Sequence, residues 1–548
     1  MITLPLQTFT FYSLIVGAIL LALHFYIENQ RIVRYANKLP GPKKLPILGH
    51  ALYLLRLKPE IIVKKSIEYN VYGPVVGGLL LNRLYVFLYH PRDIEIILKS
   101  TVNIQKSRDY DFFKPWLGDG ILISTGDKWR RHRKIIAPTF HQSVLKAFIP
   151  LFYENSRDLV MRLRDKVGQE FDCHDYMSKI TVDILLDTVM GMRATEKYKN
   201  SYEYAKAVMD ICDIIHRRHF NLQLRLDILF HWSSESKQYS KLLSTIHDLS
   251  KTVVEKRKEE YYQKYRSAIE NEDKPKRLET SVKEPSKDNN QTMRMHYVND
   301  DLDDIDRNDI GEKKRLAFLD LMLEMSRNGA QLTDEEIKDE VDTIMFEGHD
   351  TTAAASSFVL CLLGIHQDVQ NRVYEELDEI FKGSDRPCTF DDTLEMKYLE
   401  RVIFETIRLF PPVPIIAREL SEDVQLATGK YMLPKGANVV VLPFATHRMM
   451  EFYPNPEQFN PDNFLPEKMQ SRHHYSFIPF SAGPRSCVGR KYAMLKLKVV
   501  LSTILRNYRI LSNVKEKDFW LKADIILKRV DGFRIKIEPR NKTGLVAA

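Results

Sequence analysis

Cys487 is the residue whose surroundings point most clearly to chemistry. It lies in the stretch Phe480-Ser-Ala-Gly483-Pro-Arg485-Ser-Cys487-Val-Gly489, with a glycine on either side. Such glycines let the backbone turn tightly and approach a flat group, and the amides freed there can hydrogen-bond a sulfur and keep it ionised. An ionised sulfur can hold iron, Phe480 can lie against a ring, and the planar fork of Arg485 can pair with a propionate. The alternative is a buried thiol that packs as a small apolar side chain.

A second group of candidate residues lies within a helical pattern, between Glu347 and Thr351. Gly348 costs a helix about 1 kcal/mol relative to alanine, and its missing side chain leaves space for a small ligand. Asp350 and Thr351 add an acid and an alcohol beside that space, and Glu347 can share their helix face. Without a ligand, such residues form a solvated face or bond the carbonyl four residues earlier.

Two further pairs have helical spacing. Glu405 and Arg408 can form an ion pair between positions i and i+3, which on an exposed helix contributes only about 0.2–0.5 kcal/mol. Trp129 and Arg133 stand at i and i+4, so an indole N–H donor and a guanidinium can reach the same carboxylate. Each pair alone is weak, whereas the order of all four groups along the chain is informative.

Together the four groups resemble the cytochrome P-450 haem-thiolate monooxygenases, from about Leu39 to about Ile537. The resemblance implies a fold that is mainly α with a minor β part, the cytochrome P-450 fold, with an N-terminal single transmembrane helix. It also implies haem b as the cofactor, with Cys487 as the axial ligand of the iron. A thiolate in that position favours O–O cleavage and therefore predicts oxygen activation.

The resemblance assigns roles to the other residues as well. Gly348, Asp350 and Thr351 are the catalytic residues, because the acid and the alcohol next to the gap deliver protons during oxygen activation. The residues expected to bind the haem come from three parts of the chain: Cys487, Arg485, Phe480, Gly483 and Gly489; Trp129 and Arg133; and Glu347.

Glu405 and Arg408 are expected, on the same resemblance, to form a buried structural pair next to the cysteine loop. An arginine further along the chain usually completes this network. Asn463 stands at that position, so the network is expected to lack its third member unless His447 or Arg448 serves instead.

Glu347, in place of the commoner small residue, resembles family 4 of the cytochromes P-450, where such a carboxylate can form an ester with a haem methyl group. The alternative is a free carboxylate paired to a neighbour.

Three segments resemble subfamily G of insect family 4: the stretch from Glu347 to Thr351, the Asn-Pro-Asp-Asn-Phe sequence at 460–464, and an extra segment before Leu316. Members of that group are associated with oxidative decarbonylation of long-chain aldehydes to cuticular hydrocarbons. The alternative functions are ω-hydroxylation of fatty acids and xenobiotic oxidation.

The expected enzyme is an NADPH- and O2-dependent monooxygenase. Because the sequence has no convincing Rossmann fingerprint or flavin site, a separate NADPH–cytochrome P-450 reductase must supply the electrons, with cytochrome b5 as a second donor. Membrane lipid and a long-chain aliphatic substrate are the other expected partners. Basic residues are expected to steer an acidic redox partner towards the cysteine face. They are Arg130, Arg131, Lys134, Arg490, Lys491 and Lys496.

Two other classes of protein compete with this interpretation. A haem-based sensor or electron carrier needs no proton delivery, so the presence of Gly348, Asp350 and Thr351 argues against it. A structural membrane protein without haem is the third class, and a first absorption spectrum would exclude it.

Helices must position most of these residues. Helical periodicity is found over Phe148–Lys166, Ile180–Met192, Leu242–Tyr265, Leu316–Met325, Asp334–Leu363 and Tyr398–Phe410. Runs typical of strands are fewer, at Val75–Leu80, Leu84–Leu88, Asn438–Leu442 and Phe533–Ile537.

The composition is that of an ordinary globular protein. The chain has 548 residues, 44% of them hydrophobic, and its 81 Lys and Arg against 73 Asp and Glu give a net charge of +8. This excludes a disordered or collagenous chain, and so small a surplus does not argue for nucleic acid. Five cysteines without a Cys-x-x-Cys pair make a disulfide scaffold or a zinc ribbon a poor fit.

The ends of the chain suggest how the body is attached. Residues 1–27 contain no Asp, Glu, Lys or Arg, and the apolar run over residues 9–27 is about 28 Å long as a helix, close to the thickness of a bilayer core. We therefore expect a membrane anchor at 1–27, a basic and Pro-rich hinge at 28–46, and a catalytic domain at 47–548 with a polar, acidic insertion at about 267–315. The basic residues after the span predict a single-pass protein of the endoplasmic reticulum whose catalytic domain faces the cytosol.

Overall fold

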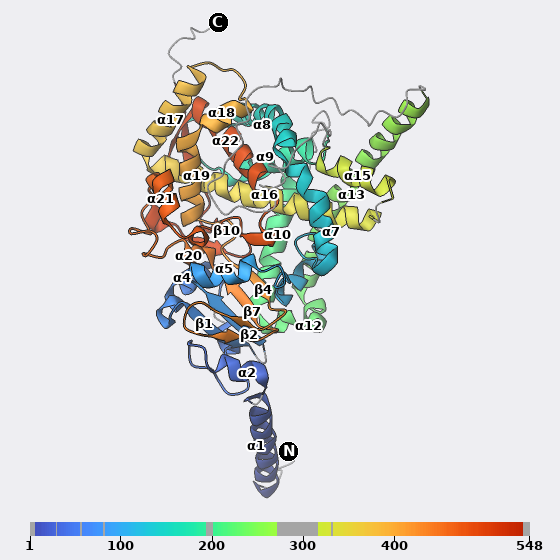
Figure 1. The fold of residues 1–548 in the computed structure, drawn as a ribbon, viewed down its shortest axis with the longest axis vertical. Coiled ribbons are helices and arrows are strands. Elements are labelled where there is room, and N and C mark those ends of the chain that lie inside the picture. Colours follow the sequence, from blue (N-terminus) through green and yellow to red (C-terminus); the bar gives the residue numbers. More distant parts are fainter. Residues whose placement is uncertain are drawn as a thin grey trace.

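Long helices form most of the body, as the periodicity predicts (Figure 1). The computed structural model describes residues 6–28, 30–54, 57–80, 83–192, 201–270, 316–329 and 332–540. The central helix is α16 (Asp334–Ile365), and α9 (His174–Thr188), α10 (Ser201–Phe220) and α22 (Arg490–Asn507) pack against it. All six predicted helical segments are confirmed.

The other longer helices are α4 (Pro59–Glu68), α5 (Pro91–Lys99), α7 (Gly126–Ile136), α8 (Gln142–Leu163), α13 (Ser234–Glu270), α15 (Phe318–Arg327), α17 (Gln367–Phe381) and α19 (Lys397–Leu409).

Shorter helical turns connect these elements: α2 (Arg31–Ala36), α3 (Ala51–Leu54), α6 (Lys114–Leu117), α11 (Leu222–Arg225), α12 (Asp227–His231), α18 (Phe390–Glu395), α20 (Pro443–Thr446) and α21 (Pro466–Ser471). The 3-10 turns that matter for the site are η2 (Arg108–Phe113) and η6 (Pro461–Phe464).

The start of α16 shows why the sequence forms a helix there. The Thr333 hydroxyl accepts the Glu336 N–H at 3.1 Å, and the Glu336 carboxylate accepts the Thr333 N–H at 3.2 Å. This capping box satisfies two backbone donors that would otherwise lack partners. Most side chains of α16 beyond Ile337 are buried, because other helices surround it.

A small β layer lies at the opposite end of the body from α17 and α18 (Figure 1). Its sheet has the order β1 (Val75–Leu80), β2 (Arg83–Leu88), β7 (Asn438–Val441), β4 (Ile416–Glu419). β2 pairs with β1 antiparallel and with β7 parallel, and β4 closes the sheet antiparallel to β7. The four predicted strands are confirmed, the last as β11. The remaining strands form small sheets: β3 (Glu170–Asp172), β11 (Arg534–Pro539) and β8 (Tyr508–Leu511); β9 (Leu521–Ala523) and β10 (Leu527–Arg529); β5 (Val424–Gln425) and β6 (Met432–Leu433).

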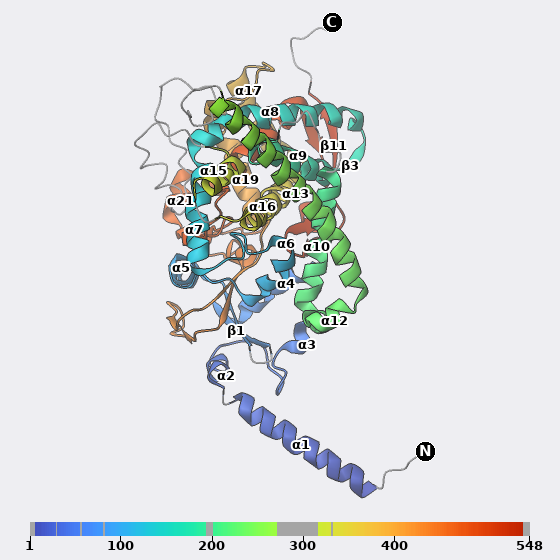
Figure 2. The same cartoon turned by 90° about the vertical axis from the view of Figure 1, so that its right-hand side faces the viewer.

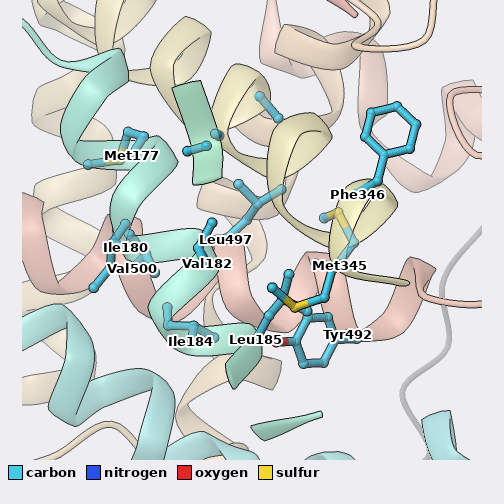
Figure 3. Packing of buried hydrophobic residues seen from close by; sticks show 14 of the residues in the cluster. Met177, Ile180, Val182, Ile184, Leu185, Met345, Phe346, Tyr492, Leu497 and Val500 are labelled. Carbon is cyan, nitrogen blue, oxygen red and sulfur yellow. The ribbon is translucent and has the colours of Figure 1, made fainter. Parts of the chain in front are cut away.

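The core between α9, α16 and α22 is built from aliphatic and aromatic side chains that point into a shared space (Figure 3). Leu185 of α9 approaches α16 so closely that a Cβ on Gly348 would lie 2.8 Å from its Cδ2 atom. Helix packing is therefore one reason for a glycine at this position, beside the space for a ligand that the sequence suggests.

The N-terminal helix α1 (Leu6–Glu28) projects from the body, as Figures 1 and 2 show. Among the described residues no single helix combines the length and apolarity needed to cross a membrane, and the apolar part of α1, Tyr12–Ile27, is shorter than such a span. Two helix pairs, Gly126–Phe140 with Gln142–Lys166 and Asp334–Ile365 with Gln367–Phe381, reach that length only across bends of 57° and 110°. The predicted transmembrane helix is thus not confirmed.

Two other segments predicted from the sequence, the hinge and the acidic insertion, can be compared with the structure only in part. The Pro-rich hinge lies against β1, where the Gly77 N–H donates to the Pro40 carbonyl at 2.7 Å. The acidic insertion begins within the end of α13, and its residues 271–315 lie outside the described part of the chain.

Candidate active site

A cavity of about 530 Å3 lies between α16, the loop before α22 and the β1–β2–β7–β4 sheet. Most of its lining side chains are aliphatic or aromatic. Nine of the sequence-predicted site residues line it: Cys487, Arg485, Phe480, Gly489, Trp129, Arg133, Glu347, Gly348 and Thr351. Gly483, Asp350, Glu405 and Arg408 are not among the lining residues.

The Cys487 loop is held in place by close backbone contacts. The Cys487 N–H donates to the Phe480 carbonyl at 2.9 Å. Gly483 has φ +68°, and a Cβ there would lie 2.0 Å from the Leu98 carbonyl oxygen at the end of α5. The turn therefore requires glycine, but Gly483 packs against α5 and not along the cavity.

The surroundings of the Cys487 sulfur do not ionise it by themselves. Burial raises the pKa of the thiol to about 11, Glu347 adds to this rise, and the Gly489 N–H only partly opposes it. In the protein alone desolvation outweighs the loop amides, and the expectation that they help to keep an iron-bound sulfur ionised stays a prediction. A coordinated metal cation would be needed to hold the thiolate form.

Several cations line the Cys487 end of the cavity. Arg485 donates to the carbonyls of Ile104, Ile121 and Ser124 and lies over the Trp129 ring. Arg133 donates to the Ser486 carbonyl at 2.8 Å.

Lys106 and Arg418 join these cations, although no sequence motif marks either of them. Burial, with Arg418 and Arg485 nearby, lowers the pKa of Lys106 well below its ordinary value. Burial also lowers the pKa of Arg485 to about 9, with Arg418 adding to the effect. Such a site lacks negative charge, which the two propionates of a haem would supply. The residues present therefore fit that group.

Glu347 is the carboxyl group that faces this cationic cluster. Burial raises the pKa of Glu347 to about 7, although Lys106 favours its ionised form. Near neutral pH it is therefore divided between the acid and the carboxylate, on the cavity wall and within electrostatic reach of Cys487.

The predicted proton-delivery pair is divided between two sides of α16. Thr351 lines the cavity, and its hydroxyl donates to the Glu347 carbonyl at 2.7 Å. Asp350 is fully buried and accepts from the Lys528 ammonium of β10 at 2.9 Å. Although burial opposes ionisation, Lys528 lowers the pKa of Asp350 below its ordinary value.

The Glu405–Arg408 pair is fully buried and bidentate, with N–O distances of 2.7 and 2.8 Å. Asn463 in η6 takes part in this network, because its side-chain amide donates to Glu405 Oε1 at 3.0 Å. His447 contributes through its backbone carbonyl, which accepts from Arg408 at 3.1 Å. Arg448 pairs with Glu457 instead, so the suggestion that it serves here is wrong.

The prediction that six basic residues form a docking face for a redox partner is also partly wrong. Arg130, Arg131 and Lys134 of α7 are exposed, whereas Arg490, Lys491 and Lys496 of α22 are buried. The Lys496 ammonium donates to the Gly348 carbonyl at 2.7 Å, so it binds the backbone of α16 beside the cavity. A buried lysine cannot be told from a surface lysine by sequence spacing alone.

A single thiol in the loop before α22, with several cations beside it in the same cavity, fits an enzyme that activates oxygen on a thiolate-bound haem. The Cytochrome P450 family model matches residues 39–536, and the chain belongs to that family. It is 50% identical to Cytochrome P450 4g15 of Drosophila melanogaster over 560 residues, which cover 97% of both chains. It is also 50% identical to Cytochrome P450 4g1 of the same species, over 94% of this chain and 91% of that protein. Cytochrome P450 4V2 of Homo sapiens is 38% identical over 93% of each chain.

These comparisons define the chain as a family 4 cytochrome P450 monooxygenase that is similar to subfamily G. The family implies haem iron, O2, and electrons from NADPH through a redox partner. The sequence-based prediction of family and enzyme class is confirmed.

We expect Lys496→Met to flatten the pH dependence of stability above pH 7. Burial lowers the pKa of Lys496 from 10.5 to about 7. Between these values the unfolded chain carries a proton that the folded protein lacks, so the free energy of unfolding rises with pH. The measurement is denaturant unfolding from pH 7 to pH 10, in which Lys496→Met loses this part of the rise. Leu495→Met, at the neighbouring buried position, is the control and should keep it; an unaltered slope in Lys496→Met contradicts the prediction.

Proposed function

We propose that this monooxygenase oxidises long-chain fatty aldehydes, releasing the carbonyl carbon as CO2 and leaving a hydrocarbon one carbon shorter. The stoichiometry is RCHO + O2 + 2e⁻ + 2H⁺ → RH + CO2 + H2O. The observation that carries the proposal is the apolar cavity of about 530 Å3 in a chain half identical to two subfamily G proteins. Such a lining suits an alkyl chain, which gains about 0.8 kcal/mol for each buried CH2 group.

The cations of the cavity favour a neutral head group over a carboxylate. Lys65 pairs with Glu68 at 2.5 Å, and Arg225 pairs with Asp109 at 2.6 Å. Tyr85 also donates to Asp109, at 3.0 Å, so this carboxylate is well satisfied. The other described cations of the lining, Lys106, Arg133 and Arg485, gather near Cys487. Among the described lining residues, none is left as a spare positive charge for a fatty-acid head group away from Cys487.

The roles proposed for the site residues follow from their positions. Cys487 would hold the iron of haem b as its thiolate ligand, and Arg133, Trp129 and Arg485 would hold the propionates. When bound, the haem supplies the activation of O2 with electrons delivered from NADPH by the reductase. Gly489 and Phe480 border the ring on the side of the ligand loop, and Gly483 acts indirectly, by fixing the turn against α5.

Thr351, Gly348 and Asp350 are proposed to act in proton delivery and oxygen binding. Thr351 lines the cavity, and its hydroxyl can pass a proton there. Asp350 lies on the side of α16 that does not line the cavity, where it binds Lys528. Gly348 leaves this part of the cavity wall without a side chain next to Leu185.

Glu347 is proposed to bind the haem covalently. The balanced step is RCOOH + CH3–haem + O2 + 2e⁻ + 2H⁺ → RCOOCH2–haem + 2H2O, in which a C–H bond is replaced by an ester C–O bond. Its position on the cavity wall and its pKa of about 7 support this role, because the carboxylate form is available at neutral pH.

We further propose that the protein is held at the endoplasmic reticulum membrane with its catalytic domain, 47–548, in the cytosol. The predicted anchor, residues 1–27, which includes most of helix α1 (Leu6–Glu28), and the hinge at 28–46 are the proposed attachment. Exposed apolar side chains on and beside α12 support a second contact with lipid; Ile228 is 76% and Trp232 85% exposed. The exposed Arg130, Arg131 and Lys134 suit docking of the reductase or of cytochrome b5.

Product analysis tests the proposed reaction. The purified protein, reconstituted with NADPH–cytochrome P-450 reductase, is given a long-chain aldehyde labelled with 13C at the carbonyl carbon. We expect a hydrocarbon without label, one carbon shorter, and labelled CO2, both measured by mass spectrometry. If fatty acids are instead converted to ω-hydroxy acids and the aldehyde gives no hydrocarbon, the family 4 reaction is hydroxylation and the proposal fails.

Replacing Cys487 with alanine should remove the thiolate ligand. We expect the Cys487→Ala protein to lose the absorption band that a thiolate-bound haem gives when reduced and exposed to carbon monoxide. Cys388→Ala is the control, because Cys388 is a buried thiol that does not line the cavity. Survival of the band in Cys487→Ala would remove this residue as the ligand.

The haem ester predicts that haem cannot be fully extracted by acidified organic solvent. Glu347→Ala should make all of the haem extractable, and Glu347→Gln, which keeps the size of the side chain, should do the same. The bound fraction is measured by chromatography of the protein at the absorption wavelength of haem. Complete extraction from the unaltered protein would mean that no ester exists.

A further inference from the structure

Three buried polar atoms without a hydrogen-bond partner belong to neighbouring side chains of α10 and α16. They are Tyr204 Oη, His349 Nε2 and Asp350 Oδ1. All three residues are at most 1% exposed. The rings of Tyr204 and His349 are 5.5 Å apart, and α10 packs directly on α16. A buried polar group without a partner costs about 1–3 kcal/mol, so three together call for an explanation.

The donor and acceptor properties of these atoms are complementary to one water molecule. His349 Nδ1 lies 2.9 Å from the Met345 carbonyl, which can only accept, so Nδ1 carries the proton. Burial lowers the pKa of His349 to about 4, so at neutral pH its Nε2 is an acceptor. Asp350 Oδ1 is an acceptor as well, and the Tyr204 hydroxyl is a donor. A water that accepts from Tyr204 and donates to both others makes three hydrogen bonds, the usual number for a buried water.

The cluster has a cavity-lining residue of α16 on one side and partly exposed side chains on the other. Asp350 directly precedes Thr351, which faces the cavity. On the other side, Asp342 lies nine residues before Thr351, about 13 Å along α16. Asp342 accepts from Lys338 at 2.7 Å and lies 3.6 Å from His247, and these two partners are 31% and 26% exposed. After burial, Asp342 and Asp350 are the main causes that raise the pKa of Tyr204, so the phenol is within electrostatic reach of both carboxylates.

We propose that Tyr204, His349 and Asp350 bind an internal water, and that protons pass through Tyr204 and this water to Asp350, the residue next to Thr351 on α16. Tyr204 gives its hydroxyl proton to the water and regains one from the Asp342 side, so it is unchanged after each transfer. His349 is a positioning residue, because it only orients the water. Two protons are consumed for each O2, whether the product is a hydrocarbon or an alcohol. The inference therefore rests on the monooxygenase class and not on the proposed aldehyde substrate.

Other ionisable groups face the cluster and set its charge. They are Lys528 of β10, which binds Asp350, together with His174 of α9, Lys496 of α22, and Cys212 of α10. Lys528 keeps Asp350 ionised, so its Oδ1 remains an acceptor for the water.

Tyr204→Phe tests the proposal, because it removes only the hydroxyl. Tyr239→Phe is the matched control: Tyr239 of α13 is also buried, and its hydroxyl also lacks a partner, but it is not among the lining residues or in this cluster. The first measurement is independent of activity, namely a high-resolution crystal structure of the resting haem protein. We expect an ordered water at about 2.7–3.2 Å from Tyr204 Oη and His349 Nε2. It should be lost or displaced in Tyr204→Phe and retained in Tyr239→Phe.

The second measurement is the solvent isotope effect on O2 consumption and the share of O2 released as hydrogen peroxide, with whichever substrate the enzyme oxidises. Tyr204→Phe should raise both severalfold, and Tyr239→Phe should leave both unchanged. Absence of the water, or wild-type values of both quantities in Tyr204→Phe, overturns the proposal. A failure to form hydrocarbon from aldehyde affects only the proposed substrate.

Discussion

Positive charge buried beside a single thiol is the constraint on which the rest of this structure depends. Lys106, Arg133 and Arg485 border the same cavity as Cys487, and Arg418 stands close behind them. Desolvation of this kind is expensive unless an anion compensates it. Desolvation also raises the pKa of the Cys487 thiol, and a bound cation would oppose this rise. A haem carries an iron centre that can bind the sulfur and two carboxylates that can compensate the positive charge. Binding of haem and completion of the fold are therefore linked events.

Much of this organisation was predictable from the sequence, because the motifs that define it are local. The Cys487 loop contains its own turn residues, and α16 carries its own capping box at Thr333 and Glu336. Helical periodicity located α8, α9, α13, α15, α16 and α19 for the same reason. The core strands β1, β2 and β7 were equally visible as short apolar runs between turn signals.

The partners that come from distant parts of the chain were not predictable. Lys528 lies 178 residues from Asp350, and Lys496 lies 148 residues from Gly348. No spacing rule relates such positions, so a basic residue near a motif was taken for part of a docking face. The roles of Lys106 and Arg418 were missed for the same reason, since neither lies in a recognisable motif. Asn463 was identified as a departure from the family, yet its contact with Glu405 became visible only in three dimensions.

The ion pair between Asp109 of η2 and Arg225 of α11 has a consequence for how long a guest molecule stays inside. These residues are 116 positions apart and border the same cavity, so the pair ties two otherwise separate segments of its wall together. The pair is thus part of the wall that encloses a flexible aliphatic chain. Because dissolved ions screen an ion pair, concentrated salt should loosen this tie and quicken both entry and escape, so residence time should shorten.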